Sequence, residues 1–463
     1  MSRGFKLYLI PVVILLAVTL PHLEQGEFRR DTVRYAAIAL HMCKDGSLLV
    51  PYLNPEKPFF NKPPLAFWIY GASLKTFGPR LAAARVPSIL AAIGVLIFSM
   101  LSVRNLGTRR EAVVSGIVLA TTYEFFRRTR EISLDFWQLF FVTAAVWLIT
   151  IAIRSGARRP IILSGIPIGL ALMCKPLVAF IVIPIFVVWL ALTQRTKLIP
   201  WLVGTLLLAI VVAAPWHLYM AATFPHFLHR YFQHEVVERA QRPDQTTSIF
   251  FYVRENAQTY WPWMLGLGCA IYFRIKQPRK RSLQRDFTVL ATVWVLISLV
   301  VLSVFADRKP NYALPLYPML SWIVAWGICR IRWPRLRSWY EQGLPWLAPA
   351  TIALGLVAAF APIKFQEPPE KNWLALTEWI KANQIDAGEL AYTHIDAVDV
   401  CYVYLKTGRW MRSLKSVQDR QPLVVTKIFE KAKAPPLDQI VFSSGPVYVL
   451  KQGGSASPKT MPK

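Results

Sequence analysis

The sequence predicts an α-helical polytopic membrane protein with a small α/β domain after its last membrane span. Three observations predict this class. Hydrophobic residues make up 54% of the 463 residues and charged residues 17%, with a mean hydropathy of +0.37. Several apolar runs approach or exceed the ~20 residues that cross a bilayer as a helix. Short loops rich in arginine and lysine separate alternate runs, as in membrane proteins whose basic loops stay in the cytoplasm.

The apolar runs predict about eleven transmembrane helices. The first run, Leu7 to Leu20, resembles the core of a secretory signal. It lacks a small-residue cleavage site and further runs follow it, so we interpret it as a retained anchor. The predicted spans occupy residues 5–22, 82–103, 111–126, 132–153, 161–174, 176–192, 198–215, 257–273, 287–305, 312–329 and 344–362.

The positive charge of the chain indicates topology. A net charge of +27 would favour nucleic-acid binding in a soluble protein. Here the charge lies in short loops between alternate spans, so we interpret these loops as cytoplasmic and expect no nucleic-acid partner. The N-terminus is then inside and the C-terminus outside. The basic loop residues are Arg104, Arg109, Arg110, Arg154, Arg158, Arg159, Arg195, Lys197, Arg274, Lys276, Arg279, Lys280, Arg281, Arg285, Arg330, Arg332, Arg335 and Arg337.

This topology divides the chain into a transmembrane domain, residues 1–362, and an outer domain, residues 363–463. Two long outer loops, 23–81 and 216–256, belong to the first domain. Tyr35, Ile38, Ala39 and Met42 share one helical face of the first loop, which predicts a helix lying along the membrane interface.

Residues 363–463 combine a helical pattern with short β-rich runs. The helix is expected over Trp373 to Asn383, and the runs PLVVTKI and GPVYVLK are expected to be strands. The final GGSASPKTMPK has the composition of a disordered tail. The five cysteines have no metal-ligand spacing. The sequence permits a Cys43–Cys401 disulfide without indicating it.

Charged and polar residues gather at the predicted outer mouth of the helix bundle. Charges at such a place are costly unless they are paired or functional. Basic residues on the outer side are also contrary to the positive-inside rule. A lipid phosphate headgroup would neutralise their charge through charge-assisted hydrogen bonds. The residues concerned are Asp31, Arg34, Lys62, Arg127 to Asp135, His217, His234, Glu235, Glu238, Arg239 and Asp307 to Tyr312.

Five motifs in this mouth resemble one enzyme family. They are D-T-V-R-Y-A-A-I-A-x-x-M (31–42) with V-P-Y-L-N and F-F-N-K-P-P-L-A-F-W after it, S-L-D (133–135), G-L-A-L-M-C-K-P-L-V-A-F (169–180), E-V-V-E-R (235–239) and R-K-P-N-Y-A-L-P-L-Y-P (308–318). Their order resembles that in the polyprenyl-phosphate-sugar-dependent glycosyltransferases of the GT-C fold. The aminoarabinose (lipid A) transferases are nearest, with the protein O-mannosyltransferases further off.

The resemblance implies an inverting transfer of a sugar from a polyprenyl (undecaprenyl) phosphate carrier to a lipid, glycan or protein acceptor. It places the chain in the cytoplasmic (inner) membrane of a bacterium as a multi-pass protein with an outer active site. It makes Asp31 the candidate base or positioning carboxylate and Asp135 its counterpart at the outer end of the fourth span. The acceptor hydroxyl needs such a base within hydrogen-bond reach.

The resemblance also assigns residues to the donor phosphate. Breaking the sugar–phosphate bond leaves a phosphate whose charge grows, and fixed cations in a water-poor site stabilise it. The residues that match are Lys62, Arg239 and Tyr312, with Arg34 and Tyr35 nearby.

Three positions depart from the family pattern. Thr32 follows Asp31 where the family often has glutamate. Asn61 and Val236 replace a glutamate and a histidine that help to hold zinc in the aminoarabinose transferases. We therefore expect no zinc ion at that place, and the sequence indicates no particular cofactor, although His234 and Glu235 stay available for a different site.

Each candidate residue also has an ordinary structural interpretation. Asp31 could form a solvated ion pair with neighbouring arginines, and Lys62 could extend to the membrane interface. Asp135 could cap its helix, Arg239 could bind lipid headgroups without selectivity, and Tyr312 could belong to a proline-rich helix break.

A polyprenyl-lipid transporter or flippase is the alternative function. It also needs a phosphate site and many spans, but it predicts charges deep in the spans that face a pathway through both leaflets. The mid-span charges here are few, and Lys175 lies at a predicted hairpin tip. The charges gathered on one side favour the enzyme.

Overall fold

A computed structural model describes residues 3–21, 23–24, 30–44, 48–54, 57–233, 250–276, 282–304, 308–331, 371–393, 395–413, 423–427, 440–444 and 446–451. The chain divides into two compact units. The helical unit comprises Met1–Leu23, Phe60–Ala66 and Arg85–Pro362. The mixed unit comprises Glu24–Phe59, Phe67–Ala84 and Ile363–Lys463.

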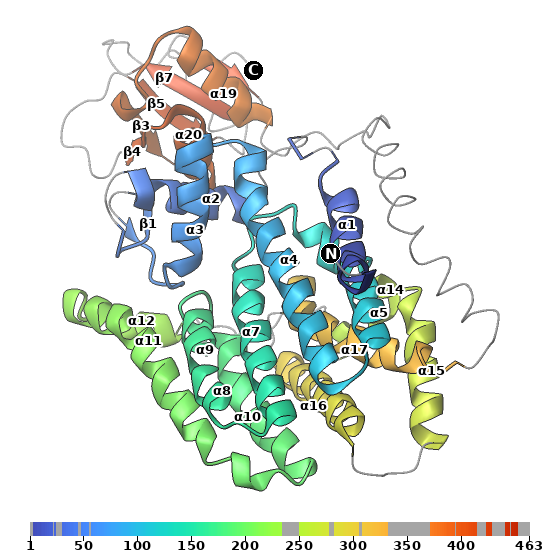
Figure 1. The fold of residues 1–463 in the computed structure, drawn as a ribbon. Helices are drawn as coiled ribbons and strands as arrows, with labels where there is room; N and C mark the ends of the chain where they lie inside the picture. Colours follow the sequence, from blue (N-terminus) through green and yellow to red (C-terminus); the bar gives the residue numbers. More distant parts are fainter. Residues whose placement is uncertain are drawn as a thin grey trace. The chain divides into compact units, whose positions relative to one another are not determined.

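In the described residues, the helical unit is built of α-helices and short 3₁₀ helices (Figure 1). α4 begins in the mixed unit and enters the helical unit at Arg85. The described elements are α1 Arg3–Thr19, α4 Leu81–Leu106, α5 Arg109–Ala120, α6 Tyr123–Arg128, α7 Leu134–Ser155, α8 Arg159–Leu163, α9 Gly165–Leu172, α10 Pro176–Leu192, η1 Thr196–Leu198, α11 Trp201–Thr223, α12 Phe227–Phe232, α14 Phe251–Thr259, α15 Trp263–Lys276, α16 Leu283–Val304, η3 Pro310–Leu316 and α17 Tyr317–Ile328.

Among the described residues, four helical segments are long and apolar enough to cross a membrane: Leu81–Leu106, Leu134–Ser155, Thr196–Thr223 and Leu283–Val304. The third is the most exposed of them, with 22% of its apolar window buried. Its exposed residues include Val203, Val211 and Leu218, a surface that suits lipid and not water. Helices also fall on the other predicted spans up to 312–329, whereas 344–362 lies outside the described residues. The predicted number of spans stays a prediction.

Three of the predicted spans are interrupted at prolines. The expected helix 161–174 is two helices, α8 and α9, with Pro167 in the first turn of α9. The expected 257–273 contains the connection before Trp263, which includes Pro262. The expected 312–329 starts as the 3₁₀ helix η3, which contains Pro315. Proline lacks the backbone N–H that would continue an α-helix and clashes with the preceding turn, so the helices are interrupted within these three predicted spans.

Close backbone packing fixes α9 against α11. A Cβ on Gly165 would lie 2.3 Å from the Thr205 carbonyl oxygen, and one on Gly169 would lie 2.7 Å from that of Ala209. The Thr205 hydroxyl donates a 2.6 Å hydrogen bond to the Ile161 carbonyl. Small residues at such contacts allow helices to approach closely. The packing therefore holds the turn that leaves α9, where Lys175 lies.

Two of the loop arginines that we interpreted as topology signals form buried ion pairs. Arg195 Nη2 lies 2.7 Å from Asp286 Oδ2, and Arg330 Nη1 lies 3.0 Å from Glu111 Oε1. Both carboxylates are almost fully buried. These arginines therefore connect helices as well as adding positive charge to the loops.

The mixed unit contains a five-stranded sheet with the strand order β4-β3-β5-β7-β6 (Figure 1). β3 is parallel to β4 and β5, and β7 is antiparallel to β5 and β6. The described elements are α2 Arg30–Lys44, β1 Tyr52–Asn54, β2 Lys57–Pro58, α3 Leu65–Phe77, α19 Lys371–Ala382, η4 Ala387–Glu389, β3 Leu390–Thr393, α20 Ala397–Thr407, β4 Arg412–Ser413, β5 Leu423–Lys427, β6 Ile440–Ser444 and β7 Val447–Lys451.

α2 carries the amphipathic pattern of the first predicted outer loop, and its apolar face packs on protein. Ile38, Ala39 and Met42 are fully buried. α2 packs on α20 and β1, and a Cβ on Gly71 of α3 would lie 2.2 Å from the Ala39 carbonyl oxygen. Packing within the mixed unit therefore accounts for the apolar face without a membrane surface.

Cys43 and Cys401 are both free thiols, so the disulfide that the sequence permits is absent. The Cys401 thiol donates to the Leu53 carbonyl at 3.5 Å, and that of Cys43 to the Trp68 carbonyl at 3.8 Å. Burial raises the pKa of Cys401 to about 12. Burial also raises the pKa of Cys43, although the charge of Lys75 opposes the shift. Each sulfur is thus a protonated thiol with its own carbonyl partner.

Candidate active site

The NKPP corner of the sequence places Lys62 in a buried turn before α3. Asn61 and Lys62 are in turn and bend conformations, and neither belongs to a helix. The two prolines that follow restrict the backbone and remove two N–H donors. The Leu65 N–H donates to the Met173 carbonyl at 3.2 Å, and the Phe60 ring packs against Phe224 at 5.1 Å. Lys62 is 5% exposed, so its ammonium lies within the protein and does not extend along its surface.

Asp135 lies in the first turn of α7 and binds two side chains. Its Oδ1 accepts a 2.5 Å hydrogen bond from Lys175 Nζ, and its Oδ2 accepts one of 3.2 Å from Asn311 Nδ2. The N-cap of α7 is Ser133, so the interpretation of Asp135 as the helix cap was wrong. The carboxylate also lies near the positive end of the helix dipole. Two donors and this dipole favour its ionised form.

Lys175 holds the centre of this cluster, a role that its predicted place at a hairpin tip did not indicate. It is the extended N-cap residue of α10, directly before Pro176. Its backbone is held at both ends, because its N–H donates to the Ala171 carbonyl at 3.0 Å and its carbonyl accepts from Gln138 Nε2. Its side chain is 7% exposed. The ammonium therefore has a defined position between α7 and η3.

Asn311 and Tyr312 enter the cluster from η3, in the R-K-P-N-Y motif. Lys175 Nζ lies 4.6 Å from the centroid of the Tyr312 ring, which is a cation–π contact. The Tyr312 N–H donates to the Lys309 carbonyl at 3.0 Å, and the Lys309 N–H donates to the Tyr252 hydroxyl at 3.3 Å. Tyr312 thus contributes a ring face to the site as well as belonging to a helix break.

Lys62 completes the cluster electrostatically. Its positive charge stabilises the Asp135 carboxylate, which also forms an ion pair with Lys175. Two buried lysines, one carboxylate, one amide and one tyrosine therefore share a region built by four of the five sequence motifs, of which the first contributes the NKPP corner. The structure brings together Lys62, Asp135 and Tyr312, which were predicted, and adds Lys175 and Asn311, which were not. Both additions lie within motifs quoted for the resemblance.

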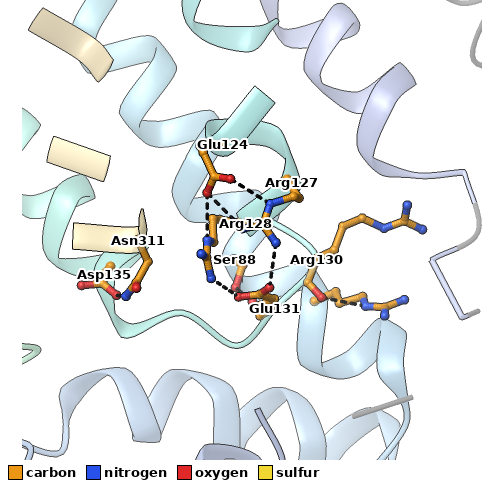
Figure 2. A network of polar contacts seen from close by, with 9 residues as sticks. Ser88, Glu124, Arg127, Arg128, Arg130, Glu131, Asp135 and Asn311 are labelled. Atoms are coloured by element: carbon orange, nitrogen blue, oxygen red, sulfur yellow. Dashed lines mark hydrogen bonds and ion pairs between the residues drawn. The ribbon is translucent and has the colours of Figure 1, made fainter. Parts of the chain in front are cut away.

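An arginine–glutamate network fixes the loop that leads into α7 (Figure 2). Glu124 binds Arg127 through two hydrogen bonds of 3.0 Å, and it accepts one of 3.1 Å from Arg128. Arg128 and Arg127 also pair with Glu131, at 2.9 and 3.5 Å. Burial disfavours the charge of Arg127, but its contacts with Glu124 outweigh this and raise its pKa. Arg127 and Arg128 of the RRTREISLD segment are therefore neutralised by Glu124 and Glu131, in the loop directly before Asp135.

Residues of α4 hold the same loop through its backbone carbonyls. Ser88 donates to the Glu131 carbonyl at 2.6 Å, and Arg85 Nε donates to the Arg130 carbonyl at 3.0 Å. Arg130 itself donates to the Pro21 carbonyl at 2.8 Å, and burial lowers its pKa. The loop before α7 is thus held through its backbone carbonyls as well as through its charged side chains.

The remaining predicted site residues divide between the mixed unit and the undescribed segments. Asp31 and Arg34, one helical turn apart on α2, form an ion pair of 2.7 Å in which the Asp31 side chain is 67% exposed. The Arg34 guanidinium lies over Tyr35 at 5.2 Å and over Phe59 at 5.8 Å. Arg239 lies outside the described residues, as do Val236, His234 and Glu235. The geometry of Asp31 is that of an ion pair on a helix, and its catalytic role stays a prediction.

Within the described part of the chain, no group of at least three His, Cys, Asp or Glu side chains could hold a metal ion. Asn61 lies in the turn before Lys62. An amide is a weaker ligand for zinc than the carboxylate it replaces. The expectation that zinc does not bind at this corner therefore stays a prediction.

An apolar cavity of about 240 Å³ lies beside the turn that carries Lys175. The ring of His217 borders it, with Nδ1 2.9 Å from the Ala213 carbonyl oxygen. Hydrocarbon would suit such a lining, because few polar atoms face it. The lining residues are Leu172, Pro176, Ile210, Ala213, Ala214, His217 and Tyr231.

The chain is similar to lipid-linked sugar transferases in sequence. Residues 61–219 match the dolichyl-phosphate-mannose-protein mannosyltransferase family. An undecaprenyl phosphate-α-4-amino-4-deoxy-L-arabinose arabinosyl transferase of Shewanella sediminis is 26% identical over 69% of this chain and 59% of its own length. One of Enterobacter sp. is 28% identical over 68% of this chain and 58% of its own length. The chain thus spans about three fifths of the length of these curated relatives.

Solved structures share the fold. ArnT from Cupriavidus metallidurans bound to undecaprenyl phosphate has a TM-score of 0.69 at 16% identity, over 99% of this chain and 100% of that chain. The oligosaccharyltransferase of Archaeoglobus fulgidus has a TM-score of 0.58 at 12% identity, over 90% of this chain and 65% of that chain. These comparisons confirm the resemblance that the motifs indicated, and they show a mostly helical fold of the ArnT type.

Proposed function

We propose that this chain is a membrane glycosyltransferase that moves a sugar from a polyprenyl (undecaprenyl) phosphate carrier to an acceptor, with inversion at the sugar carbon. The observation that carries the proposal is the buried cluster in which Lys175 and Lys62 neighbour Asp135. The relatives add support, because their names specify an undecaprenyl phosphate-linked sugar donor and one solved structure of the same fold binds undecaprenyl phosphate.

The buried lysines suit a leaving phosphate. As the bond between sugar and phosphate breaks, negative charge builds on the leaving oxygen, and a fixed cation stabilises this charge more than it stabilises the ground state. Lys62 is fixed by the NKPP corner and by the packing of Phe60. We assign the donor phosphate to Lys62 and Tyr312, with Arg239, Arg34 and Tyr35 as further ligands by the family resemblance.

The two aspartates have different roles in this mechanism. Both oxygens of Asp135 already accept hydrogen bonds, from Lys175 and Asn311, which favours a permanently ionised group that orients its neighbours. Asp31 is more exposed and has a single arginine partner among the described contacts. A carboxylate of this kind can take a proton from an acceptor hydroxyl, so we assign the base to Asp31.

The apolar cavity gives the carrier lipid a place next to this site. Its wall is formed partly by α11, whose exposed apolar face suits the bilayer. The cavity also borders Leu172 and Pro176, on either side of the turn with Lys175. We assign it to the first isoprene units of the carrier, which would enter from the membrane and leave the phosphate near the lysines.

The proposal includes the architecture expected from the sequence. About eleven spans cross the cytoplasmic (inner) membrane of a bacterium, the active site and residues 363–463 face the outside, and no zinc ion takes part. The loop 23–81 and residues 363–463 are both assigned to the outer side. Most of their residues belong to the mixed unit, in agreement with this assignment.

Transfer of label from a polyprenyl-phosphate sugar tests the function. Membranes that contain the chain are incubated with the labelled donor, and the products are separated into lipid, glycan and protein fractions. We expect the label to leave the carrier and to appear in one of these fractions, which also identifies the acceptor. Label that crosses the membrane while still attached to the carrier would overturn the proposal in favour of a transporter.

A further inference from the structure

The C-terminal half of α2 is clamped by residues from the far end of the chain, within the mixed unit. His41 on α2 lies among three aromatic rings, with centroid distances of 6.1 Å to Tyr52, 5.9 Å to Tyr404 and 5.6 Å to Trp410. All three contacts are edge-to-face, with interplanar angles of 86° to 90°. This geometry is the favoured one for aromatic rings.

One hydrogen bond orients the His41 ring within this aromatic group. Trp410 Nε1 donates to His41 Nδ1 at 3.2 Å. The Trp410 ring stacks on Tyr404 of α20 with a centroid distance of 4.0 Å and an interplanar angle of 9°. Tyr404 is almost fully buried. Trp410 is thus fixed by α20 and transmits that position to His41.

Two lysines hold the end of the same helix. Lys44 Nζ donates to the Gly408 carbonyl at 3.2 Å, and Lys75 Nζ of α3 donates to the Cys43 carbonyl at 2.7 Å. Gly408 is the left-handed C-cap residue of α20. Side-chain donors at the last carbonyls stabilise a helix end. α2 is therefore bound to α20 by its terminal turn as well as by His41.

When one end of a helix is held in place, the position of its other end is restricted as well. Asp31 lies ten residues before His41 on α2, which corresponds to about 15 Å of helix rise. An unbroken helix of this length bends little. The contacts at His41 and Lys44 therefore determine where the other end of α2, with Asp31 and Arg34, can lie.

We propose that the region from α20 to β4 positions α2, and with it Asp31, through the hydrogen bond between Trp410 and His41. Trp410 and His41 are then positioning residues for the transfer reaction, and this inference rests on the proposed function, in which Asp31 is the base. It gives the C-terminal segment a role in catalysis: it orients a helix from the first outer loop.

Substitutions that remove the hydrogen bond test the proposal, and Trp410→Phe does so while it keeps an aromatic ring in place. Trp410→Phe keeps a ring over Tyr404 and loses the indole N–H, and His41→Ala removes the acceptor. His41→Asn places an amide oxygen near the position of Nδ1. We expect Trp410→Phe and His41→Ala to lower turnover by about fivefold, the ratio that one ordinary hydrogen bond represents, and His41→Asn to restore most of it. Trp379→Phe is the matched control, because Trp379 packs on Phe442 of β6 at 5.3 Å.

Hydrogen exchange separates this inference from the proposed function. In the full chain, Trp410→Phe should speed amide exchange in residues 31–44 and leave exchange in α7 unchanged. Unchanged exchange in 31–44 would overturn the positioning role, and so would an equal loss of turnover in Trp379→Phe. Faster exchange in 31–44, combined with wild-type turnover in Asp31→Asn, would uphold the clamp and refute the base, and thereby the catalytic role of Trp410.

Discussion

Lys175 Nζ lies 2.5 Å from Asp135 Oδ1, between the start of α10 and the first turn of α7. Both side chains are largely buried, at 7% and 15% exposure. Each is also held by a neighbour, because Asn311 binds the carboxylate and Gln138 binds the Lys175 backbone. A buried ion pair with such support costs most when one partner is removed, since the other is left without its counter-charge.

The stability of this pair gives the first prediction. Asp135→Asn should lower the free energy of unfolding by about 3–5 kcal/mol, because the Lys175 charge stays buried. The double variant Asp135→Asn/Lys175→Met should recover much of that loss without recovering turnover. Thermal unfolding of the purified protein in detergent measures the first quantity, and label transfer measures the second. A double variant as unstable as Asp135→Asn would show that Lys175 is not the partner that matters.

Asp31 gives the second prediction. Asp31→Asn should abolish transfer while the protein stays folded and membrane-inserted, because an amide cannot accept the acceptor proton. The ion pair with Arg34 is exposed, and exposed pairs contribute little to stability. Comparing turnover with thermal stability separates the two effects. Near-normal turnover in Asp31→Asn would make Asp31 an ordinary surface carboxylate.

Metal independence is the third prediction. By the family resemblance, Asn61 stands where a glutamate is expected at the NKPP corner, and Val236 stands where a histidine is expected three residues before Arg239. Since neither side chain is a usual zinc ligand, chelation should leave turnover unchanged, and purified protein should contain less than stoichiometric zinc by elemental analysis. A loss of activity on chelation that zinc reverses would indicate a site among other residues, such as His234 and Glu235.

Topology is the fourth prediction. Reporter fusions after Arg281 and after Lys364 should report opposite sides of the membrane, inside and outside, because the positive loop residues stay in the cytoplasm. The same fusions test which side carries the active site. Two reporters on one side would remove the argument that the site faces outward.

Hydrophobic periodicity predicted most helix positions in this chain, because a span needs a long apolar run. It did not predict the breaks at Pro167, Pro262 and Pro315, where local chain geometry overrides hydropathy. It also assigned the apolar face of α2 to a membrane surface, although Ala39 and Met42 pack on protein. An amphipathic pattern shows that a face is buried, and the partner comes from tertiary structure.

Motifs predicted Lys62, Asp135 and Tyr312 but not how they are connected. Lys175 lies in a quoted motif, yet its place between Cys174 and Pro176 resembled a hairpin tip. Its partner Asp135 is 40 residues away in sequence and Asn311 is 176 residues from Asp135. Such pairings depend on how α7, α10 and η3 pack. The signal that could have found Lys175 is its charge next to an apolar run, which demands a partner.

Lys62 gives the last prediction. Its ammonium is buried by a corner that Pro63 and Pro64 stiffen, and Phe60 is held by Phe224. In the proposed mechanism, the Lys62 ammonium therefore contacts the donor phosphate without having to be ordered first, and it should bind the transition state more strongly than the ground state.

Lys62→Ala should accordingly lower both turnover and donor affinity. The expected loss of transition-state stabilisation is about 2–4 kcal/mol. Lys62→Arg should recover part of this loss, because a planar fork replaces a compact charge. Lys197→Ala is the control, since Lys197 is an exposed lysine of η1. Steady-state kinetics with varied donor measure both terms. Unchanged kinetics in a correctly inserted Lys62→Ala protein would show that Lys62 has no role in catalysis. Lys62 would then be only a structural partner of Asp135.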